Sequence, residues 1–291
     1  MKKYAPIIIL GMHRSGTSMI ARMLEELGLF MGVHKDRNNE AFLFMKLNDW
    51  LMEQNSCCWD NPRSFSHFLE NNDVRDLTVG QIHSILQSKY MASYLGKKHL
   101  HQQGRSMQLD FPWAWKDPRT TFTLPFWLEI FPGVKIIHIY RNGVDVANSL
   151  KTRHENFLAR NKRNLAKGKY LPKYRFWKQL KLRSVGDSMR CSSLEGGFSL
   201  WEEYIDEARR HVAIMGSDAL EICYEDFLAD PVSHLETMAN YCGLRPDAGK
   251  LASMAKKVNK DRVNAFLKDP DLSAFAGSVA ARLEAHGYHY P

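Results

Sequence analysis

The sequence predicts an α/β fold: a mostly parallel sheet of the P-loop type, flanked by helices and carrying helical insertions. Three observations lead to this class. A short apolar run at residues 7–10 stops at a glycine, an amphipathic segment follows, and similar pairs recur along the 291-residue chain. Continuous apolar runs are typical of strands buried on both faces, and their alternation with helical patterns indicates strands joined by helical crossovers.

The order of the elements follows from these patterns. The strand at residues 7–10 leads through a glycine-bearing loop into a helix that ends at Gly28. Further strands are predicted at residues 134–140 and 219–223. Helical patterns lie at residues 41–54, 76–95, 119–130, 197–214 and 231–242, and one follows residue 143. Because no repeat or linker separates these segments, we expect a single domain over residues 1–291, with a basic insertion at about 151–190.

Composition excludes several classes of protein. Apolar residues make up 44% of the chain, which excludes disorder over most of its length. The five cysteines lack the paired spacing of a metal site, so we predict no metal and a reducing compartment. No apolar run approaches the ~20 residues that span a bilayer, and the N-terminal run is too short for a signal peptide. A cytoplasmic protein is expected, and peripheral contact with a membrane stays open.

The net charge of +8 is concentrated in one segment. Between residues 151 and 190 there are 13 Lys and Arg and two acids, which gives this segment +11 and leaves −3 for the rest. A solvated helical face, a basic lid and a docking surface for an anionic partner all fit this pattern. Nucleic acid is disfavoured as a partner, because the interleaved aromatic residues carry no recognition motif.

Residues 11–18 (GMHRSGTS) have the Gly-x-x-x-x-Gly spacing of a phosphate-binding loop between a strand and a helix. A nucleoside triphosphatase has a lysine after the second glycine, but Thr17 stands there, and the positive charge lies within the loop as Arg14. The missing lysine argues against Mg²⁺-assisted cleavage of phosphates. Sulfuryl transfer is compatible with a loop that lacks this lysine, because the migrating group carries less charge than a phosphoryl group.

Four elements resemble one family. Residues 13–18 (HRSGTS) resemble the 5′-phosphosulfate loop of the sulfotransferases that use 3′-phosphoadenosine-5′-phosphosulfate (PAPS). Arg141 and Ser149 resemble that family's 3′-phosphate-binding pair, and Arg141 leaves a strand end, where ligands bind in such sheets. Residues 224–227 (YEDF) resemble the family's Tyr-Glu-Asp element, whose tyrosine lies near the adenine. Residues 116–119 (KDPR) resemble the Lys-Asp-Pro element of the protein-tyrosine sulfotransferase branch.

The resemblance implies metal-independent, in-line transfer of sulfuryl from PAPS to a hydroxyl acceptor. The residues that it assigns to PAPS binding are Arg14, Ser15, Gly16, Thr17, Ser18, Arg141, Ser149 and Tyr224. Cytosolic members carry Lys at the position of Arg14, so this chain resembles the bacterial and protein-tyrosine branches. Because arginine hardly gives up a proton, Arg14 is expected to act by its charge. The cytosolic enzymes' glycine-rich C-terminal loop is missing, and residues 260–262 (KDR) are a poor substitute.

The attacking hydroxyl needs a general base, and Glu40 is the leading candidate. Its alternative role is to stabilise the helix at 41–54 through the helix dipole. His13 and His34 are rival bases, although packing is expected for His13 and solvent exposure for His34. Lys116 is expected to stabilise charge on the bridging oxygen, with a solvated strand-end lysine as the alternative.

Other residues around this motif have structural interpretations as well. Arg119 either holds the substrate or begins the following helix, and Asp117 either orients Lys116 or caps that helix. Core packing is the expected role of several large apolar residues: Trp113, Trp115, Phe42, Phe44, Met45 and Met52.

The acceptor stays open among a carbohydrate, a lipid, a peptide tyrosine and a small metabolite, anionic ones included. Two other functions fit the motifs. One is a P-loop kinase-like, ATP-dependent phosphotransferase, against which the missing lysine argues. The other is a non-catalytic module that binds a polyanion or a membrane on the same fold.

Overall fold

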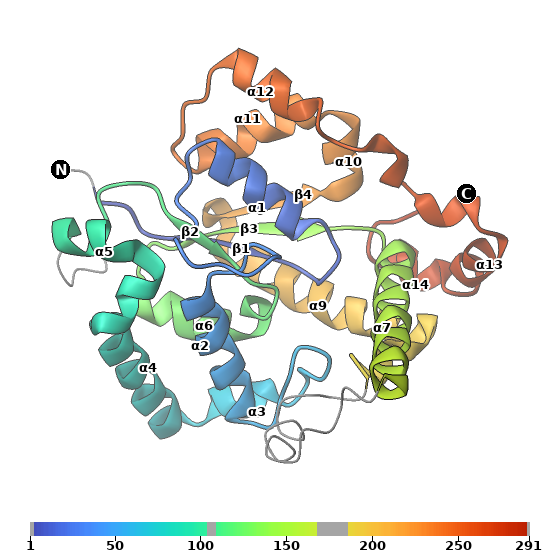
Figure 1. Cartoon of the computed structure of the whole chain (residues 1–291), viewed down its shortest axis with the longest axis horizontal. Coiled ribbons are helices and arrows are strands. Elements are labelled where there is room, and N and C mark those ends of the chain that lie inside the picture. Colours follow the sequence, from blue (N-terminus) through green and yellow to red (C-terminus); the bar gives the residue numbers. More distant parts are fainter. Residues whose placement is uncertain (1–2, 104–108, 168–185, 290–291) are drawn as a thin grey trace. The chain divides into compact units, whose positions relative to one another are not determined.

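The computed structural model describes residues 3–103, 109–167 and 186–289 (Figure 1). The chain forms two compact units. The first comprises Met1–Arg141 and Glu203–Val263, and the second comprises Asn142–Glu202 and Asn264–Pro291. Helix α9 (Leu194–Met215) begins in the second unit and ends in the first.

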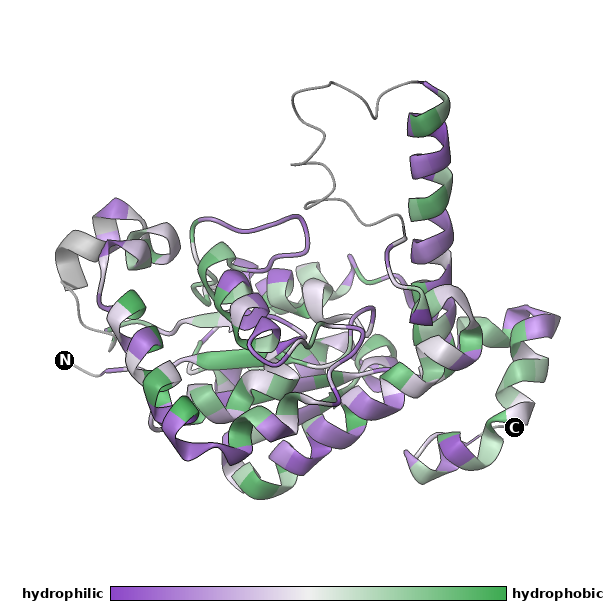
Figure 2. Ribbon diagram, turned by 90° about the horizontal axis from the view of Figure 1, so that it is seen from below, coloured by the Kyte–Doolittle hydropathy of each residue, from purple (hydrophilic) through white to green (hydrophobic). Residues whose placement is uncertain are grey.

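A parallel sheet is the framework of the first unit. Its strands are β1 (Ile7–Leu10), β2 (Ala114–Lys116), β3 (Lys135–Tyr140) and β4 (Ala219–Cys223). Over the described residues their order is β2-β1-β3-β4, and all neighbours are parallel. Every residue of β1 is buried, and the strands are coloured mainly as hydrophobic in Figure 2. The predicted α/β class, with a mostly parallel sheet flanked by helices, is therefore confirmed.

One face of the sheet is covered by helices from both sequence segments of the first unit (Figure 1). They are α1 (Thr17–Glu26), α10 (Tyr224–Ala229), α11 (Pro231–Tyr241) and α12 (Ala248–Ala255). Ile20 and Leu24 of α1 share one buried core with Ile137 of β3 and Leu235 of α11. Burial of these side chains fixes α1, and with it the loop between β1 and α1, on the sheet.

The other face is covered by α2 (Phe42–Glu53) and α6 (Thr120–Ile130), and its core is aromatic. The ring of Phe44 stacks on Trp115, with centroids 4.0 Å apart and planes 2° from parallel. Trp113, Trp115 and Trp127 are all fully buried, which confirms core packing for the tryptophan pair before Lys116. Phe42 is 44% exposed, so its predicted core position is wrong. It is the first residue of α2, where its side chain falls outside the buried stripe of the helix.

The remaining helices of the first unit are α3 (Phe65–Glu70), α4 (Asn72–Leu86) and α5 (Ala92–Gln103). The prediction of one helical segment over 76–95 is wrong, because α4 ends at Leu86 and a 3₁₀ turn, Lys89–Met91, separates it from α5. Ser88 causes the break: its hydroxyl bonds the carbonyl oxygen of Ile85 at 2.6 Å and accepts from the backbone N–H of Tyr90. A side chain that bonds the local backbone in this way competes with the helix.

The second unit contains α7 (Gly143–Ala166), α13 (Pro270–Ser278) and α14 (Ala280–Ala285). Asn142 caps α7 by accepting from the backbone N–H of Val144. Asp145 in its first turn accepts from the backbone N–H groups of Ala265 and Phe266, which ties α7 to the C-terminal segment.

The predicted basic insertion, 151–190, is described only in part. Its N-terminal residues form the hydrophilic end of α7, which is mostly purple in Figure 2, and residues 168–185 lie outside the described residues. Over the part of the chain that the structure describes, no helix is long and apolar enough to cross a membrane.

The two phenylalanines at the start of α2 provide a test of the aromatic core. We expect Phe44→Ala to lower the free energy of unfolding by about 3–5 kcal/mol, because it empties space against Trp115. Phe42→Ala is the matched control on the same helix, and we expect a change within about 0.5 kcal/mol because Phe42 is exposed. Urea denaturation followed by tryptophan fluorescence measures both. Equal losses for the two variants would contradict this packing.

Candidate active site

The candidate residues gather at one edge of the sheet because the strands are parallel. The loop of residues 11–16 follows β1, and Lys116 ends β2. Arg141 follows β3, and Tyr224 follows β4. The carboxyl ends of parallel strands lie at the same edge, which is where ligands bind in open α/β sheets. Each strand therefore delivers one of the predicted site elements to this edge.

The conformation of the phosphate loop requires its two glycines. Gly11 has φ 132°, and a Cβ atom there would lie 2.2 Å from the carbonyl oxygen of Ile139 on β3. Gly16 has φ 98° and caps α1 in the left-handed region, which glycine adopts without steric cost. Arg14, at φ 72°, is left-handed as well, and it lies exposed on the loop. The loop thus turns tightly around the N-terminus of α1 and presents a guanidinium at its outer side.

Ser15 holds this loop to the neighbouring strand. Its buried hydroxyl lies 2.6 Å from the carbonyl oxygen of Met12 and 3.1 Å from that of Ile139. The single hydroxyl proton is thereby directed to the backbone. Of the other predicted loop residues, Thr17 is buried and Ser18 is partly exposed in the first turn of α1. The first N–H groups of a helix have no intrahelical acceptor, so this turn is suited to an anion.

Gly16, Tyr224 and Arg141 form one cluster. A Cβ atom on Gly16 would lie 2.4 Å from the Tyr224 ring, so the ring packs directly on the loop. The guanidinium of Arg141 lies over the same ring, 4.9 Å from its centroid. Arg141 also donates to the carbonyl oxygen of Arg262 at 3.1 Å. The structure therefore joins the loop, the arginine after β3, the tyrosine after β4 and the turn at 260–262.

Glu40 lies in a tight loop before α2 that its neighbours shape. The carboxylate of Asp36 accepts from the backbone N–H groups of Asn38 and Glu40 at 2.8 and 2.9 Å. Asn39 between them has φ 66°, a left-handed conformation that asparagine tolerates better than most residues. This loop turns Glu40 inward, where its residue is only 5% exposed.

The carboxylate of Glu40 lies between two cations. Its Oε1 accepts from Lys116 Nζ and its Oε2 from Arg119 Nη2, both at 2.8 Å. Lys116 is buried, so the alternative of a solvated strand-end lysine is wrong. Burial raises the pKa of Glu40, and the negative charge of Asp117 raises it further, while Lys116 and Arg119 oppose the rise. Two hydrogen bonds use about half of the acceptor capacity of a carboxylate, so Glu40 has lone pairs left for a proton.

Arg119 binds two more carboxylates. Its Nε donates to Asp117 Oδ1 at 2.8 Å, and its Nη1 binds Asp49 Oδ1. These acidic neighbours raise the pKa of Arg119 against the opposing effect of burial. Asp117 also accepts from the backbone N–H of Arg119, at the start of α6. Asp117 thus accepts from a backbone N–H at the beginning of α6, as its capping interpretation predicts, and its charged partner is Arg119. Arg119 directly precedes α6, as one of its two interpretations predicts.

Asn48 supports Asp117 from α2. Its Nδ2 donates to Asp117 Oδ2 at 2.8 Å, and its Oδ1 accepts from Thr123 Oγ1 and Trp127 Nε1 at 2.7 and 2.9 Å. Sequence reasoning missed Asn48 and Asp49. A signal was present for Asn48: it lies on the apolar stripe of α2 with Phe44, Leu47 and Leu51, where a polar residue needs a buried partner.

The two rival bases have the surroundings expected of them, and Ser149 belongs to the second unit. His13 packs edge-on against Trp59, with ring centroids 4.9 Å apart, and His34 is exposed. Ser149 is partly exposed on α7, in the second unit, whereas Arg141 ends the first part of the first unit. Among the described residues no group of three or more His, Cys, Asp or Glu is placed to hold a metal ion.

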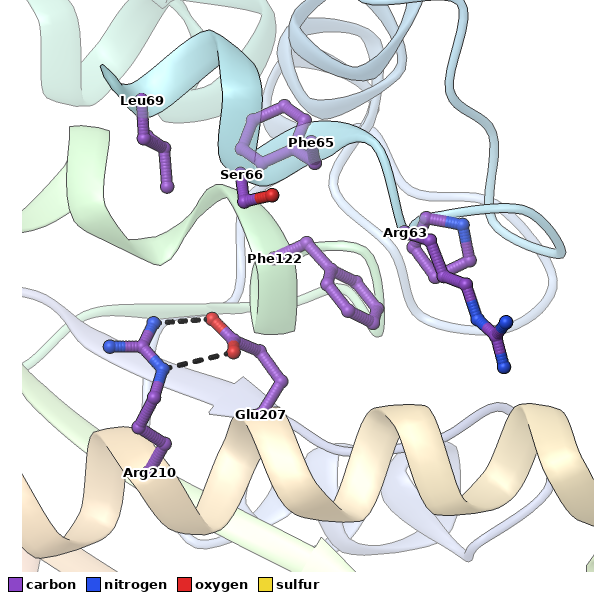
Figure 3. A pocket seen from close by; sticks show the side chains of 8 residues that line it. Arg63, Phe65, Ser66, Leu69, Phe122, Glu207 and Arg210 are labelled. Atoms are coloured by element: carbon purple, nitrogen blue, oxygen red, sulfur yellow. Dashed lines mark hydrogen bonds and ion pairs between the residues drawn. The ribbon is translucent and has the colours of Figure 1, made fainter.

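A pocket of about 210 Å³ lies apart from these clusters, between α3, α6 and α9 (Figure 3). Its described lining is Pro62, Arg63, Phe65, Ser66, Leu69, Phe122, Glu207 and Arg210. Glu207 and Arg210 form a two-fold ion pair along its wall, and Arg63 points away from the cavity. None of the residues predicted for the active site lines it. Its walls are mainly apolar, and Glu207 of its ion pair also contacts His211 Nε2 at 3.0 Å.

Comparison with known proteins gives the family. The sequence matches the model of the "Sulfotransferase family" over residues 6–248. The chain therefore belongs to the sulfotransferase family, whose members are enzymes that transfer a sulfuryl group. A comparison with curated protein sequences gives no match.

The chain is also similar to solved structures, and one of them has a TM-score above 0.5. The sulfotransferase domain from the curacin biosynthetic pathway is 14% identical, with 100% of both chains covered and a TM-score of 0.51. A sulfotransferase from Alicyclobacillus acidocaldarius is 16% identical over 97% of this chain and 95% of that one, at a TM-score of 0.45. The sulfotransferase domain of the Synechococcus PCC 7002 olefin synthase is 17% identical over 98% and 95%, also at 0.45.

Two left-handed glycines test the contact between the loop and Tyr224. Gly16→Ala and Gly28→Ala both place an alanine at positive φ, which costs about 1–2 kcal/mol each. Only Gly16→Ala also meets the Tyr224 ring, whereas a Cβ at Gly28 meets nothing within 4 Å. We expect a clearly larger loss of unfolding free energy for Gly16→Ala in urea denaturation. Equal losses would show that the ring does not pack on the loop.

Proposed function

We propose that this enzyme transfers the sulfuryl group of PAPS to a hydroxyl acceptor, in line and without a metal. The observation that carries the proposal is the placement of a buried, cation-bound Glu40 at the same sheet edge as a lysine-free phosphate loop. The loop would bind a nucleotide that carries the anionic group to be transferred. Glu40 would take the proton from the attacking hydroxyl.

The loop would hold the 5′-phosphosulfate. Thr17 and Ser18 would supply first-turn N–H groups and hydroxyls, Gly16 would allow close approach of the backbone, and Arg14 would add charge. Ser15 would contribute by keeping the loop in shape, because its hydroxyl bonds backbone carbonyls. A helix N-terminus, glycine backbone and one exposed cation are chemically suited to an anion of this size.

The 3′-phosphate and the adenine would lie toward β3 and β4. Arg141 would bind the 3′-phosphate through its guanidinium, as a fork of N–H donors suits phosphate oxygens. Ser149 on α7 would add its hydroxyl. Tyr224 lies under the Arg141 guanidinium, so its ring would support this arginine and border the adenine. The turn at 260–262 contacts Arg141 through the carbonyl oxygen of Arg262, in keeping with a minor role near the same phosphate.

In the reaction the acceptor oxygen would attack sulfur, forming the new O–S bond. The S–O bond to the 5′-phosphate would break, and its electron pair would leave on the phosphate oxygen. The acceptor's proton would pass to the carboxylate of Glu40. Lys116 keeps two of its three N–H donors beyond the bond to Glu40, so it would both hold the base and stabilise charge on the bridging oxygen.

The acceptor would carry a hydroxyl, as a carbohydrate, lipid, peptide tyrosine or small metabolite does. Screening extracts with PAPS labelled in the sulfuryl group, followed by mass identification of the product, would find it. The role of the basic segment is tested by neutralising its Lys and Arg between 160 and 183. An increased acceptor KM supports a lid or docking surface, and an unchanged KM supports a solvated face.

Binding of the reaction product 3′,5′-diphosphoadenosine tests the donor site. We expect Arg141→Ala to weaken its binding about 10- to 100-fold, because a charge-assisted phosphate contact is lost. Isothermal titration calorimetry measures this, with Glu129→Gln on the outer side of α6 as the control that keeps wild-type affinity. Tight binding of ATP and Mg²⁺ without binding of 3′,5′-diphosphoadenosine would reject the proposed donor and favour a kinase-like enzyme.

Replacing the proposed base tests the chemistry. We expect Glu40→Gln to lower kcat about 10²- to 10⁴-fold, as loss of a general base does, with little change in the affinity for 3′,5′-diphosphoadenosine. The transfer of label from PAPS to the acceptor found by screening measures kcat. A variant that keeps wild-type transfer would remove Glu40 from the mechanism. Nucleotide binding without transfer to any acceptor would favour a binding module.

A further inference from the structure

The charges around Glu40 do not balance. In the described structure its cluster contains the buried carboxylates of Glu40 and Asp117, the partly exposed carboxylate of Asp49, and the cations Lys116 and Arg119. The exposed Lys46 lies at the rim, beside Asp49, and is not counted with them. Three negative charges therefore face two positive charges. Uptake of one proton makes the cluster neutral, and burial favours the neutral state.

The distribution of the two cations is uneven as well. Lys116 binds Glu40, whereas Arg119 divides its donors among Glu40, Asp117 and Asp49. Asp117 is the most deeply buried of the three carboxylates, with a side chain 1% exposed, and it receives Arg119 at 2.8 Å. Asp49 is 32% exposed, so solvent screens its charge. Asp117 is thus the main counter-charge that keeps Arg119 from acting on Glu40 alone.

We propose that Asp117 is a positioning residue that keeps Glu40 able to accept the acceptor's proton, by binding the guanidinium of Arg119 that would otherwise neutralise Glu40. The inference rests on the proposed role of Glu40 as the general base. It assigns Asp117 an electrostatic task beyond capping α6. Without the negative charge at 117, two cations would face Glu40 and Asp49, the cluster would be neutral, and Glu40 would hold a proton less readily.

Asn48 holds the Asp117 carboxylate in place with a neutral hydrogen-bond donor. Thr123 and Trp127 both donate to its Oδ1, so the orientation of its amide is fixed and its Nδ2 must point to Asp117 and Thr120. A neutral donor of this kind satisfies an oxygen of the buried Asp117 side chain without adding a cation to the cluster. An arginine or lysine at this position would cancel the charge that Asp117 offers to Arg119.

Other titratable groups near the cluster are Asp36, Lys46 and Tyr204. Asp36 accepts from the backbone N–H of Glu40 at 2.9 Å and does not contact its carboxylate. Lys46 on α2 is 3.7 Å from Asp49 Oδ2 and 72% exposed, and it faces solvent. Tyr204 on α9 is buried beside Arg119 and Asp117, and burial raises its pKa well above the ordinary value, so it stays neutral. The charge on Glu40 is therefore governed by Lys116, Arg119 and Asp117.

A charge-relocation experiment tests the inference. Asp117→Asn removes the negative charge, and the double variant N48D/D117N moves it to position 48. The double variant keeps the net charge and exchanges donor for acceptor between the two side chains. The amide at position 117 can still donate to the carboxylate at position 48 and accept from Arg119. Glu40 is followed by carbon NMR in protein labelled at the glutamate side-chain carboxyl, with its resonance assigned by its loss in Glu40→Gln. No acceptor is required for this measurement.

We expect the titration midpoint of Glu40 to fall by about one pH unit or more in Asp117→Asn and also to fall in N48D/D117N. The acidic limb of the pH–rate profile should move to lower pH by the same amount, with a lower kcat above it. Glu129→Gln, which removes a carboxylate on the outer side of α6, is the control and should leave the midpoint unchanged.

A wild-type midpoint in the double variant would overturn the inference, because it would show that a negative charge elsewhere in the cluster acts as well as one at position 117, bound to Arg119. An unchanged midpoint in folded Asp117→Asn, checked by circular dichroism, would overturn it too. These outcomes are separate from the proposed function. Wild-type transfer by Glu40→Gln would reject Glu40 as the base, whatever the midpoints are.

Discussion

The buried carboxylate of Glu40, held between Lys116 and Arg119, constrains the rest of the site. A buried charge is costly unless it is paired, and removal of one partner from a buried ion pair typically costs about 3–5 kcal/mol. Here the paired groups come from the loop before α2, from the end of β2 and from the start of α6. These elements must therefore meet, and the stacking of Phe44 on Trp115 and the hydrogen bonds of Asn48 bring α2 to β2 and α6.

The phosphate loop depends on a different constraint, which is contact between backbones. Gly11 lies so close to the carbonyl oxygen of Ile139 that no side chain fits, and Ser15 bonds the same carbonyl group. The loop after β1 is thereby attached to the end of β3, next to Arg141. Tyr224, which follows β4, then fills the space over Gly16. Ile139 and Tyr224 are distant from the loop in the sequence. They reach it because the sheet order places β3 beside β1 and β4 beside β3.

What could be predicted from the sequence was local or belonged to a motif. The strand at 7–10, the glycine loop and the helix after it show themselves in consecutive residues, and the residue types of Glu40, Lys116 and Arg141 suggested their chemistry. The partners of these residues were not predictable in the same way. Glu40 and Lys116 are 76 positions apart, Asn48 and Asp117 are 69 apart, and only packing brings them together. The end of α4 depended on a hydrogen bond of the Ser88 hydroxyl, and the spacing of apolar residues gives no sign of such a bond.

The charges of the cluster also fit a requirement that the proposed reaction would impose. An anionic donor needs cations near the loop, but cations near the base make it a poorer acceptor of protons. In this structure Arg14 is exposed on the loop and Arg141 lies over Tyr224, whereas the cations at Glu40 are matched by carboxylates. Arg119 in particular is bound by Asp117 and Asp49 as well as by Glu40. Pairing the cations locally would let one sheet edge provide positive charge for the proposed donor and an excess negative charge for the acceptor's proton.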